Sequence, residues 1–254
     1  MNSGVDKAHF LEAIAHPIDV NRIGNALVIA PHPDDESLGC GGTIALLRQQ
    51  GFRVHVLFVS DGTMSHPNSP SYPAERLRQV RESEALDALR ELDVPAENAF
   101  FMRQKDTQVA TPDSPDFADV VAFVHTLLTD IKPATVLVPW RRDPHRDHRA
   151  SWQVVNAALS ALTVQPKVLE YLIWLWELGD ERDMPGHDEM LVWSVPIETV
   201  IAQRNKAIAA HRSQVSRLID DDPTAFYLSP ELLMHFNKPR ELFLEDRITE
   251  PDYA

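Results

Sequence analysis

Cysteine is nearly absent from this sequence, and long apolar runs and positive charge are scarce as well. Cys40 is the only cysteine, so an intrachain disulfide cannot form and the chain fits a reducing cytoplasm. Any zinc site must therefore use histidine and carboxylate ligands. No apolar run reaches about 18 residues, the length that predicts a membrane span. The polar N-terminal segment lacks the apolar core of a secretory signal, so we expect a cytoplasmic protein.

Basic residues are outnumbered by acidic ones. The 24 Lys and Arg residues against 38 Asp and Glu residues give a formal net charge of −14, which would repel a phosphate backbone. We therefore expect no nucleic-acid partner. The 254 residues suffice for one large domain, and no repeat, linker or low-complexity tract divides them. The sequence thus predicts a single domain over residues 1–254, and an oligomer is compatible with it.

Short apolar runs alternate with longer amphipathic segments. Strands of the buried, parallel type are expected at Ala26–Ala30, Val54–Ser60, residues 99–102 and Thr135–Pro139. Helices are expected over residues 38–50, 74–92, 117–130 and 150–162. This alternation is typical of βαβ units. We therefore expect an α/β fold with a Rossmann-like, mostly parallel sheet and helices on both of its faces.

The C-terminal third is less regular. Strands are expected over residues 168–176 and 190–195, and one helix over residues 196–218. Residues from about 220 onward show no pattern that predicts an element. Core positions are expected for three tryptophans, with the lining of an apolar pocket as the alternative: Trp174, Trp176 and Trp193. The polar loops over residues 62–73 and 107–116 are expected to shape the mouth of a site.

A first cluster of ionisable residues directly follows the strand at Ala26–Ala30. Ligands of open parallel sheets bind at the carboxyl ends of strands. His32 and Asp35 are three residues apart in a turn, a spacing that lets both reach one metal ion. Asp34 between them would be free to act as a base on metal-bound water. Helix capping by the same acidic residues is the alternative, although three consecutive acids repel one another unless a cation or the helix end offsets them.

A second cluster follows the strand at Thr135–Pro139. His145 and His148 are three residues apart, and one of them could complete a zinc site with three protein ligands. The other could donate a proton or stabilise an oxyanion, and Asp147 could orient an imidazole and favour its protonated form. The alternative is a helix start capped by Asp147, with both histidines exposed. Two such clusters at strand ends can converge in space, which favours the metal site.

Three glycines, Gly39, Gly41 and Gly42, follow the first cluster. A dinucleotide-binding loop needs its first glycine immediately after the strand, and here Gly39 comes too late in the chain. The spacing therefore argues against a nucleotide-binding Rossmann protein. The glycines are better explained by close packing of the first helix on the sheet, or by close approach of backbone to a ligand.

The segments at residues 30–36 (APHPDDE) and 144–148 (PHRDH) closely resemble the PIG-L/LmbE-like deacetylases. That family includes the N-acetylglucosaminyl-phosphatidylinositol de-N-acetylase and the deacetylases of mycothiol and bacillithiol biosynthesis. The resemblance extends over residues 26–162 and returns at residues 206–214. It implies a zinc-dependent hydrolase that removes an N-acetyl or other N-acyl group from a small molecule or glycoconjugate containing an amino sugar.

The resemblance also implies roles for individual residues. The implied zinc ligands are His32, Asp35 and His148. Asp34 would be the general base, and His145 would be the charged partner that stabilises the oxyanion or protonates the leaving amine. Arg81 and Asp106 match positions that contact the substrate in the family. Because Asp rather than Cys completes the ligand set, Fe²⁺ or another divalent metal could replace Zn²⁺.

One position departs from the family. Some members carry a tyrosine two residues before the position of His145, and here that residue is Asp143, so no role of the tyrosine can be transferred. Two other functions stay open at this point: hydrolysis of a non-sugar N-acyl compound, and a non-catalytic sugar-binding module on the same fold. The complete set of His and Asp residues in both clusters favours an enzyme.

Overall fold

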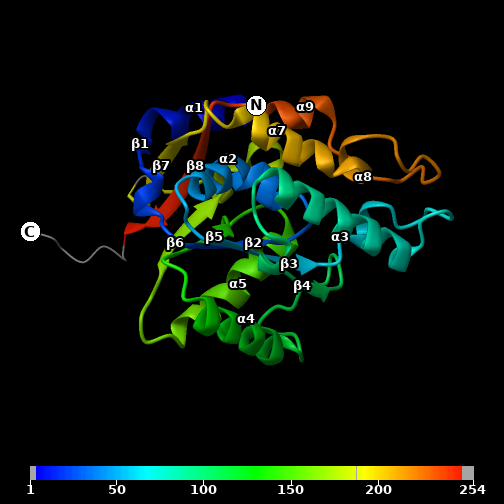
Figure 1. The fold of residues 1–254 in the computed structure, drawn as a ribbon, viewed down its shortest axis with the longest axis horizontal. Coiled ribbons are helices and arrows are strands. Elements are labelled where there is room, and N and C mark those ends of the chain that lie inside the picture. Colours follow the sequence, from blue (N-terminus) through cyan, green and yellow to red (C-terminus); the bar gives the residue numbers. More distant parts are fainter. Residues whose placement is uncertain (1–3, 187, 248–254) are drawn as a thin grey trace, which may run out of the picture.

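An eight-stranded, mostly parallel sheet forms the centre of the protein in a computed structural model that describes residues 4–186 and 188–247 (Figure 1). The strands are β1 (His16–Pro17), β2 (Ala26–Ala30), β3 (Val54–Ser60), β4 (Ala99–Gln104), β5 (Thr135–Pro139), β6 (Lys167–Tyr171), β7 (Met190–Pro196) and β8 (Arg240–Asp246). Their order across the sheet is β1-β7-β8-β6-β5-β2-β3-β4. All neighbours pair in parallel except β8, which runs antiparallel to β6 and β7.

Helices cover both faces of the sheet (Figure 1). They are α1 (Gly4–Ile14), α2 (Asp35–Gln49), α3 (Ala74–Glu91), α4 (Phe117–Ile131), α5 (Arg146–Ser160), α6 (Leu175–Leu178), α7 (Ile201–Ala210), α8 (Arg212–Val215) and α9 (Pro230–Met234). Short 3₁₀ turns are η1 (Val20–Arg22), η2 (Thr63–Ser65), η3 (Ala96–Asn98) and η4 (Glu181–Asp183). None of the helices within the described ranges has both the length and the apolar character needed to cross a membrane.

The side chains of β2 alternate between two hydrophobic cores, one on each face of the sheet. Ala26 and Val28 point into the core beneath α2 and α3, whereas Leu27 and Ile29 point into the core formed with α4 and α5. Every residue of β2 is buried, as the apolar run predicts for a central parallel strand. The expected α/β fold with a mostly parallel sheet and helices on both faces is confirmed.

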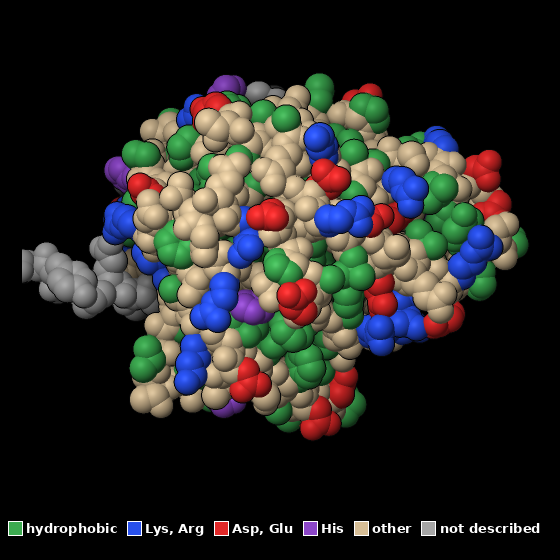
Figure 2. Space-filling model, in the orientation of Figure 1, with side chains coloured by type: hydrophobic (Ala, Val, Ile, Leu, Met, Phe, Trp, Pro, Cys, Tyr) green, Lys and Arg blue, Asp and Glu red, His purple; other side chains and the backbone are tan. Residues whose placement is uncertain are grey.

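Charged side chains of both signs are mixed over the surface. Figure 2 shows Lys and Arg side chains interleaved with Asp and Glu on the face that it presents. The net charge of −14 is therefore not gathered into one acidic patch on this face.

The structure corrects three expectations in the C-terminal third. The strand expected over residues 168–176 ends at Tyr171, because the chain turns there toward the carboxyl end of β5 and α6 follows. The helix expected over residues 196–218 is two helices, α7 and α8, divided at His211. The break brings the His211 ring to Glu36, with 2.9 Å between Nε2 and Oε1. The unpatterned last segment contains α9 and the antiparallel strand β8.

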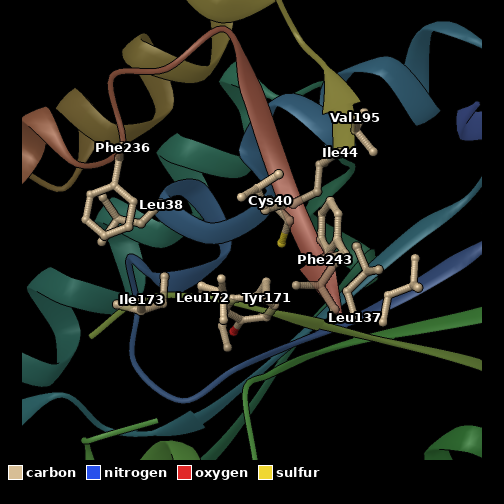
Figure 3. Packing of buried hydrophobic residues seen from close by; sticks show 14 of the residues in the cluster. Leu38, Cys40, Ile44, Leu137, Tyr171, Leu172, Ile173, Val195, Phe236 and Phe243 are labelled. Atoms are coloured by element: carbon tan, nitrogen blue, oxygen red, sulfur yellow. The ribbon is translucent and has the colours of Figure 1, made fainter. Parts of the chain in front are cut away.

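Helix α2 packs very closely on the sheet, as expected from its glycines. A Cβ atom on Gly39 would lie 2.3 Å from Cδ2 of Tyr171. Tyr171 cannot easily move away, because it is fully buried and its hydroxyl donates a hydrogen bond to the Ile29 carbonyl at 2.6 Å. Figure 3 shows Leu38, Cys40 and Ile44 of α2 facing Tyr171 and Phe243 of the sheet. This contact fixes the start of α2, and with it the turn that carries the first cluster.

The helix is interrupted once, at Cys40, where φ is −149°. The interruption frees two backbone N–H groups, and Glu241 of β8 accepts from both, at 2.7 Å from Gly42 N and 2.8 Å from Thr43 N. The Glu241 carboxylate also accepts from the Thr43 hydroxyl at 2.7 Å. Strand β8 therefore satisfies polar groups that a continuous helix would satisfy internally.

We predict that Gly39→Ala destabilises the protein by about 1–3 kcal/mol despite the better helix propensity of alanine, because the new methyl group overlaps the Tyr171 ring. Gly186→Ala is the control, since its Cβ would lie 3.4 Å or more from the nearest atoms outside its own neighbours. Urea unfolding of the two variants measures the difference. Equal stability of Gly39→Ala and the parent protein would contradict the argument.

Candidate metal and active site

The two ionisable clusters meet at the carboxyl ends of neighbouring strands. The first cluster, His32 to Glu36, lies between β2 and the first turn of α2, and the second lies between β5 and the first turn of α5. Strands β2 and β5 pair in parallel, so both clusters lie at the same edge of the sheet. A pocket of about 290 Å³ opens at this edge of the sheet. The charged or titratable side chains that line it are His32, Asp34, Asp35, Arg81, Asp106 and His145. Asp147 and His148 are fully buried beside them.

Three histidine rings lie close together in the site. The ring centroids are 4.7 Å apart for His32 and His145, 5.4 Å for His32 and His148, and 5.1 Å for His145 and His148. Asp35 Oδ2 lies 3.2 Å from Nδ1 of His32 and 3.2 Å from Nε2 of His148. The two histidines and the carboxylate that the sequence singled out therefore converge on one point from two distant segments.

The chemistry of these donors fits a divalent metal ion. Both ring nitrogens of His148 are buried and neither makes a hydrogen bond of good geometry, although Asp35 Oδ2 lies 3.2 Å from Nε2 and Asp143 Oδ1 lies 3.4 Å from Nδ1. Such a state usually costs stability unless another group satisfies the nitrogens. Burial opposes ionisation of Asp35, but His148 and His32 more than offset it and hold the pKa of that carboxyl well below its usual range. Two groupings have ligand atoms within 4.8 Å of one another: His32 with His145 and His148, and His32 with Asp106 and Asp147.

His145 is held as a neutral donor. Its Nδ1 accepts a hydrogen bond from the Asp147 backbone N–H at 3.2 Å, so in the neutral ring the proton is on Nε2. Burial lowers the pKa of His145 to about 4, and the positive charges of His32 and His148 act in the same direction. The arrangement suits donation of a hydrogen bond from Nε2 rather than a permanent positive charge.

The Asp147 carboxylate faces His32, a histidine of the other cluster, rather than His145 or His148 of its own cluster. Its carboxylate Oδ2 lies 3.3 Å from Nε2 of His32 and accepts the Thr107 N–H at 2.7 Å, while only its backbone contacts His145. Asp106 Oδ1 also lies 3.3 Å from Nε2 of His32. The two carboxylates hold that ring so that its Nδ1 faces Asp35.

Asp34 has an unusual backbone conformation, with φ of 150° and ψ of −27°. Its N–H donates to Glu36 Oε2 at 3.0 Å, and its carboxylate Oδ2 lies 3.0 Å from Nη2 of Arg81. Burial raises the pKa of the Asp34 carboxyl to about 6, an effect that the guanidinium of Arg81 partly offsets. Glu36, itself paired with His211, and Arg81 therefore hold a strained residue with its carboxyl in the pocket.

Arg81 is almost completely buried, whereas a residue that contacts the substrate is expected to be accessible from the pocket. The side chain is 3% exposed, and its guanidinium donates to the Gly62 and Pro33 carbonyls at 2.7 Å each, besides contacting Asp34. Asp106 lines the pocket while its Oδ2 accepts the Met64 N–H at 2.8 Å. Both residues are thus part of the frame around Asp34 and His32 as well as of the pocket wall.

Sequence reasoning missed two contributors to the site. Asp143 is buried, with Oδ1 3.4 Å from Nδ1 of His148 and Oδ2 accepting the Trp174 N–H at 3.0 Å. The sequence marks Asp143 only as the position where some family members carry a tyrosine. A carboxylate behind a histidine is a common way to orient a metal ligand. For Trp174 the core position favoured by the sequence is wrong and the alternative holds: its ring stacks on His145, with 6.2 Å between ring centroids, and lines the pocket. Trp176 does lie in the core.

The rim of the pocket comes from three loops. The loop over residues 62–73 contributes Met64 and Ser65, and the loop over residues 107–116 contributes Thr107, so both reach the mouth as expected. A third loop, residues 216–229, had no recognisable signal and contributes Phe226 and Leu228. Only the folded structure reveals this part of the site.

Comparison with known proteins agrees with this geometry. The sequence model of the PIG-L family, described as GlcNAc-PI de-N-acetylase, matches residues 27–159, more than half of the chain. The chain belongs to this family. The resemblance inferred from the two motifs is thus confirmed, and the family is one of deacetylases.

Curated relatives and solved structures are similar over most of their length. A probable N-acetyl-alpha-D-glucosaminyl L-malate deacetylase 2 of Bacillus subtilis (strain 168) is 30% identical over 198 residues, 77% of this chain and 85% of that protein. A 1D-myo-inositol 2-acetamido-2-deoxy-alpha-D-glucopyranoside deacetylase of Mycolicibacterium vanbaalenii is 27% identical, covering 80% and 84%. The zinc-inhibited form of teicoplanin deacetylase Orf2 shares the fold, with a TM-score of 0.62, 20% identity and coverage of 91% and 100%.

We predict that Asp34→Gly is more stable than Asp34→Ala by about 1–2 kcal/mol, because glycine tolerates the strained φ and both variants lose the same carboxylate. The same two substitutions at Asp87, within α3, serve as the control and should show the reverse order by about 1 kcal/mol. Thermal unfolding of the four variants tests this. An Asp34→Gly variant that is less stable than Asp34→Ala would show that the backbone there is not strained.

Proposed function

We propose that this protein is a divalent-metal-dependent hydrolase that removes an N-acetyl group from a small molecule containing an amino sugar. The observation that carries the proposal is the meeting of Asp35 with His32 and His148, flanked by Asp34 and His145. The named activities of the Bacillus subtilis and Mycolicibacterium vanbaalenii relatives support the choice of an N-acetylated glucosamine derivative. A cytoplasmic location agrees with the single cysteine and stays a prediction.

We assign the metal ligands as His32, Asp35 and His148, with Zn²⁺ as the ion that two imidazoles and one carboxylate suit well. The same donors accept Fe²⁺ or another divalent ion. When bound, the ion lowers the pKa of water and polarises the amide carbonyl. Three carboxylates hold the histidine rings in place: Asp143 lies against His148, and Asp106 and Asp147 lie against His32.

The protein's own groups would then move the protons. The Asp34 carboxylate takes a proton from the water whose oxygen attacks the acyl carbon, and Arg81 keeps this carboxylate in position. The Nε2–H of His145 donates a hydrogen bond to the carbonyl oxygen as negative charge develops there. When the C–N bond breaks, the proton held by Asp34 passes to the nitrogen, and the products are acetate and a free amine.

We predict that Asp34→Asn and His145→Ala each lower kcat for acetate release by about 10²- to 10⁴-fold while keeping the bound metal. His125→Ala, on the outer helix α4 away from the pocket, is the control for histidine removal and should retain full activity. Acetate assays with N-acetylglucosamine derivatives and elemental analysis of each variant measure the two effects. Near-parental turnover by both site variants, with metal present, would rule out these roles.

The assay also separates the other functions. Acetate release from N-acetyl peptides but not from N-acetylglucosamine derivatives would indicate a non-sugar amidohydrolase. Stoichiometric metal and sugar binding without any acetate would indicate a binding module.

A further prediction concerns the carboxylate behind His148. Asp143→Asn should weaken Zn²⁺ affinity by about 10- to 100-fold, because the amide supports the Nδ1 proton of His148 less well. Competition with a chelating dye measures the affinity. Asp116→Asn, an exposed residue at the start of α4, is the matched control and should bind zinc normally. An unchanged affinity in a folded Asp143→Asn variant would exclude the assigned role.

A further inference from the structure

The outer half of the pocket is apolar. Its wall contains Trp174, Phe226, Met64, Leu178, Leu38 and Leu228. Large apolar side chains are normally buried, yet Met64 is 41% exposed, Leu178 58% and Phe226 42%. Three of the exposed large hydrophobic side chains of the described chain are therefore gathered at the mouth of one pocket. Such clustering marks a surface that a ligand covers.

The wall is continuous with the reacting groups. Trp174 stacks on His145 at 6.2 Å and meets Phe226 edge to face, with 5.6 Å between ring centroids. A group attached to the sugar on the side away from the acetamido group can therefore lie along these two aromatic rings while the amide reaches His145. Aromatic rings prefer offset or edge-on contacts with one another over a face-to-face sandwich, and an aromatic group of the substrate can make such contacts with this pair.

The wall is also held in place before any ligand binds. The Phe226 N–H donates to the Ser65 carbonyl at 2.9 Å, which ties the loop of residues 216–229 to the loop of residues 62–73. Farther out, the Ser69 hydroxyl donates to Asp221 at 2.5 Å and the Asn68 N–H donates to Asp222 at 2.8 Å. A fixed apolar surface lowers the entropic cost of binding a rigid apolar group.

Cations are scarce in the same pocket. Arg81 is the one Lys or Arg among the described residues that line it. Both of its terminal nitrogens already donate to carbonyls or to Asp34, and its Nε is buried out of reach. Apart from the histidines His32 and His145 on the floor of the pocket, the remaining ionisable residues of the lining are acidic: Asp34, Asp35 and Asp106. A carboxylate on the outer part of a substrate would find no free cation there.

We propose that the natural substrate carries an uncharged aromatic group on its N-acetylglucosamine unit, bound along Trp174 and Phe226. This inference rests on the proposed deacetylase function and narrows its substrate class. It separates this protein from its Bacillus relative, whose named substrate carries malate, a dicarboxylate.

The test compares three N-acetylglucosaminides on the metal-loaded protein: the phenyl glycoside, the methyl glycoside and the malate conjugate. We expect kcat/KM for the phenyl glycoside to exceed each of the other two at least tenfold, mainly through KM. Equal or better use of the malate conjugate would overturn the inference. Acetate from none of the three would refute the deacetylase function instead. In that case calorimetry with the Asp34→Asn variant tests binding to the apolar wall without catalysis. Tighter binding of the phenyl glycoside than of the methyl glycoside would support the aromatic binding site, and equal or weaker binding would overturn it.

Two variants locate the effect. Phe226→Ala should reduce the phenyl-to-methyl ratio of kcat/KM at least fivefold, and Phe226→Lys should raise kcat/KM for the malate conjugate. Phe123→Ala removes an equally exposed phenylalanine from α4, far from the pocket, and should leave the ratio unchanged. An unchanged ratio in a folded Phe226→Ala variant would show that the aromatic wall does not bind the substrate.

Discussion

The Asp35 carboxylate, placed between the imidazoles of His32 and His148, is the interaction on which the rest of the site depends. It joins the turn after β2 to the turn after β5, which are close only because these strands are parallel neighbours. In parallel strands both carboxyl ends lie at one edge of the sheet, so both turns deliver their side chains to the same place. The charge of this carboxylate lets two imidazoles approach closely in a buried position.

Much of the surrounding structure keeps that arrangement rigid. The close contact of Gly39 with Tyr171 sets the start of α2, and Glu241 of β8 supports the helix where it is interrupted. Glu36 and Arg81 hold Asp34 in a backbone conformation that an isolated peptide would avoid. A base in a fixed position loses little freedom when it reacts, and such preorganisation is a main source of catalytic power. These contacts of the fold thus offset the backbone strain at Asp34, the residue that serves as the base in the proposed mechanism.

The site combines a polar floor with an apolar outer wall. The floor carries the carboxylates and imidazoles to which the proposed mechanism assigns proton transfer and metal binding, and these groups follow the ends of β2 and β5. The wall includes Trp174, which follows β6, and Phe226 and Leu228 of the loop of residues 216–229. The proposed reaction and the proposed substrate preference therefore depend on different parts of the chain, as is usual for open α/β folds.

The central strands, the two ionisable clusters and the family could be predicted from the amino-acid sequence, because they are local patterns of polarity and spacing. Apolar runs such as Ala26–Ala30 predict buried strands wherever they pair, and the acid-rich turns after them carry their ionisable groups in adjacent residues. Three features became visible only in the folded protein: β8 inserts antiparallel between β6 and β7, Asp147 faces His32, and Asp143 lies behind His148. Folding also brought Trp174 and the loop of residues 216–229 to the pocket. These are contacts between distant segments, and they depend on how the elements pack against one another rather than on any periodicity along the chain.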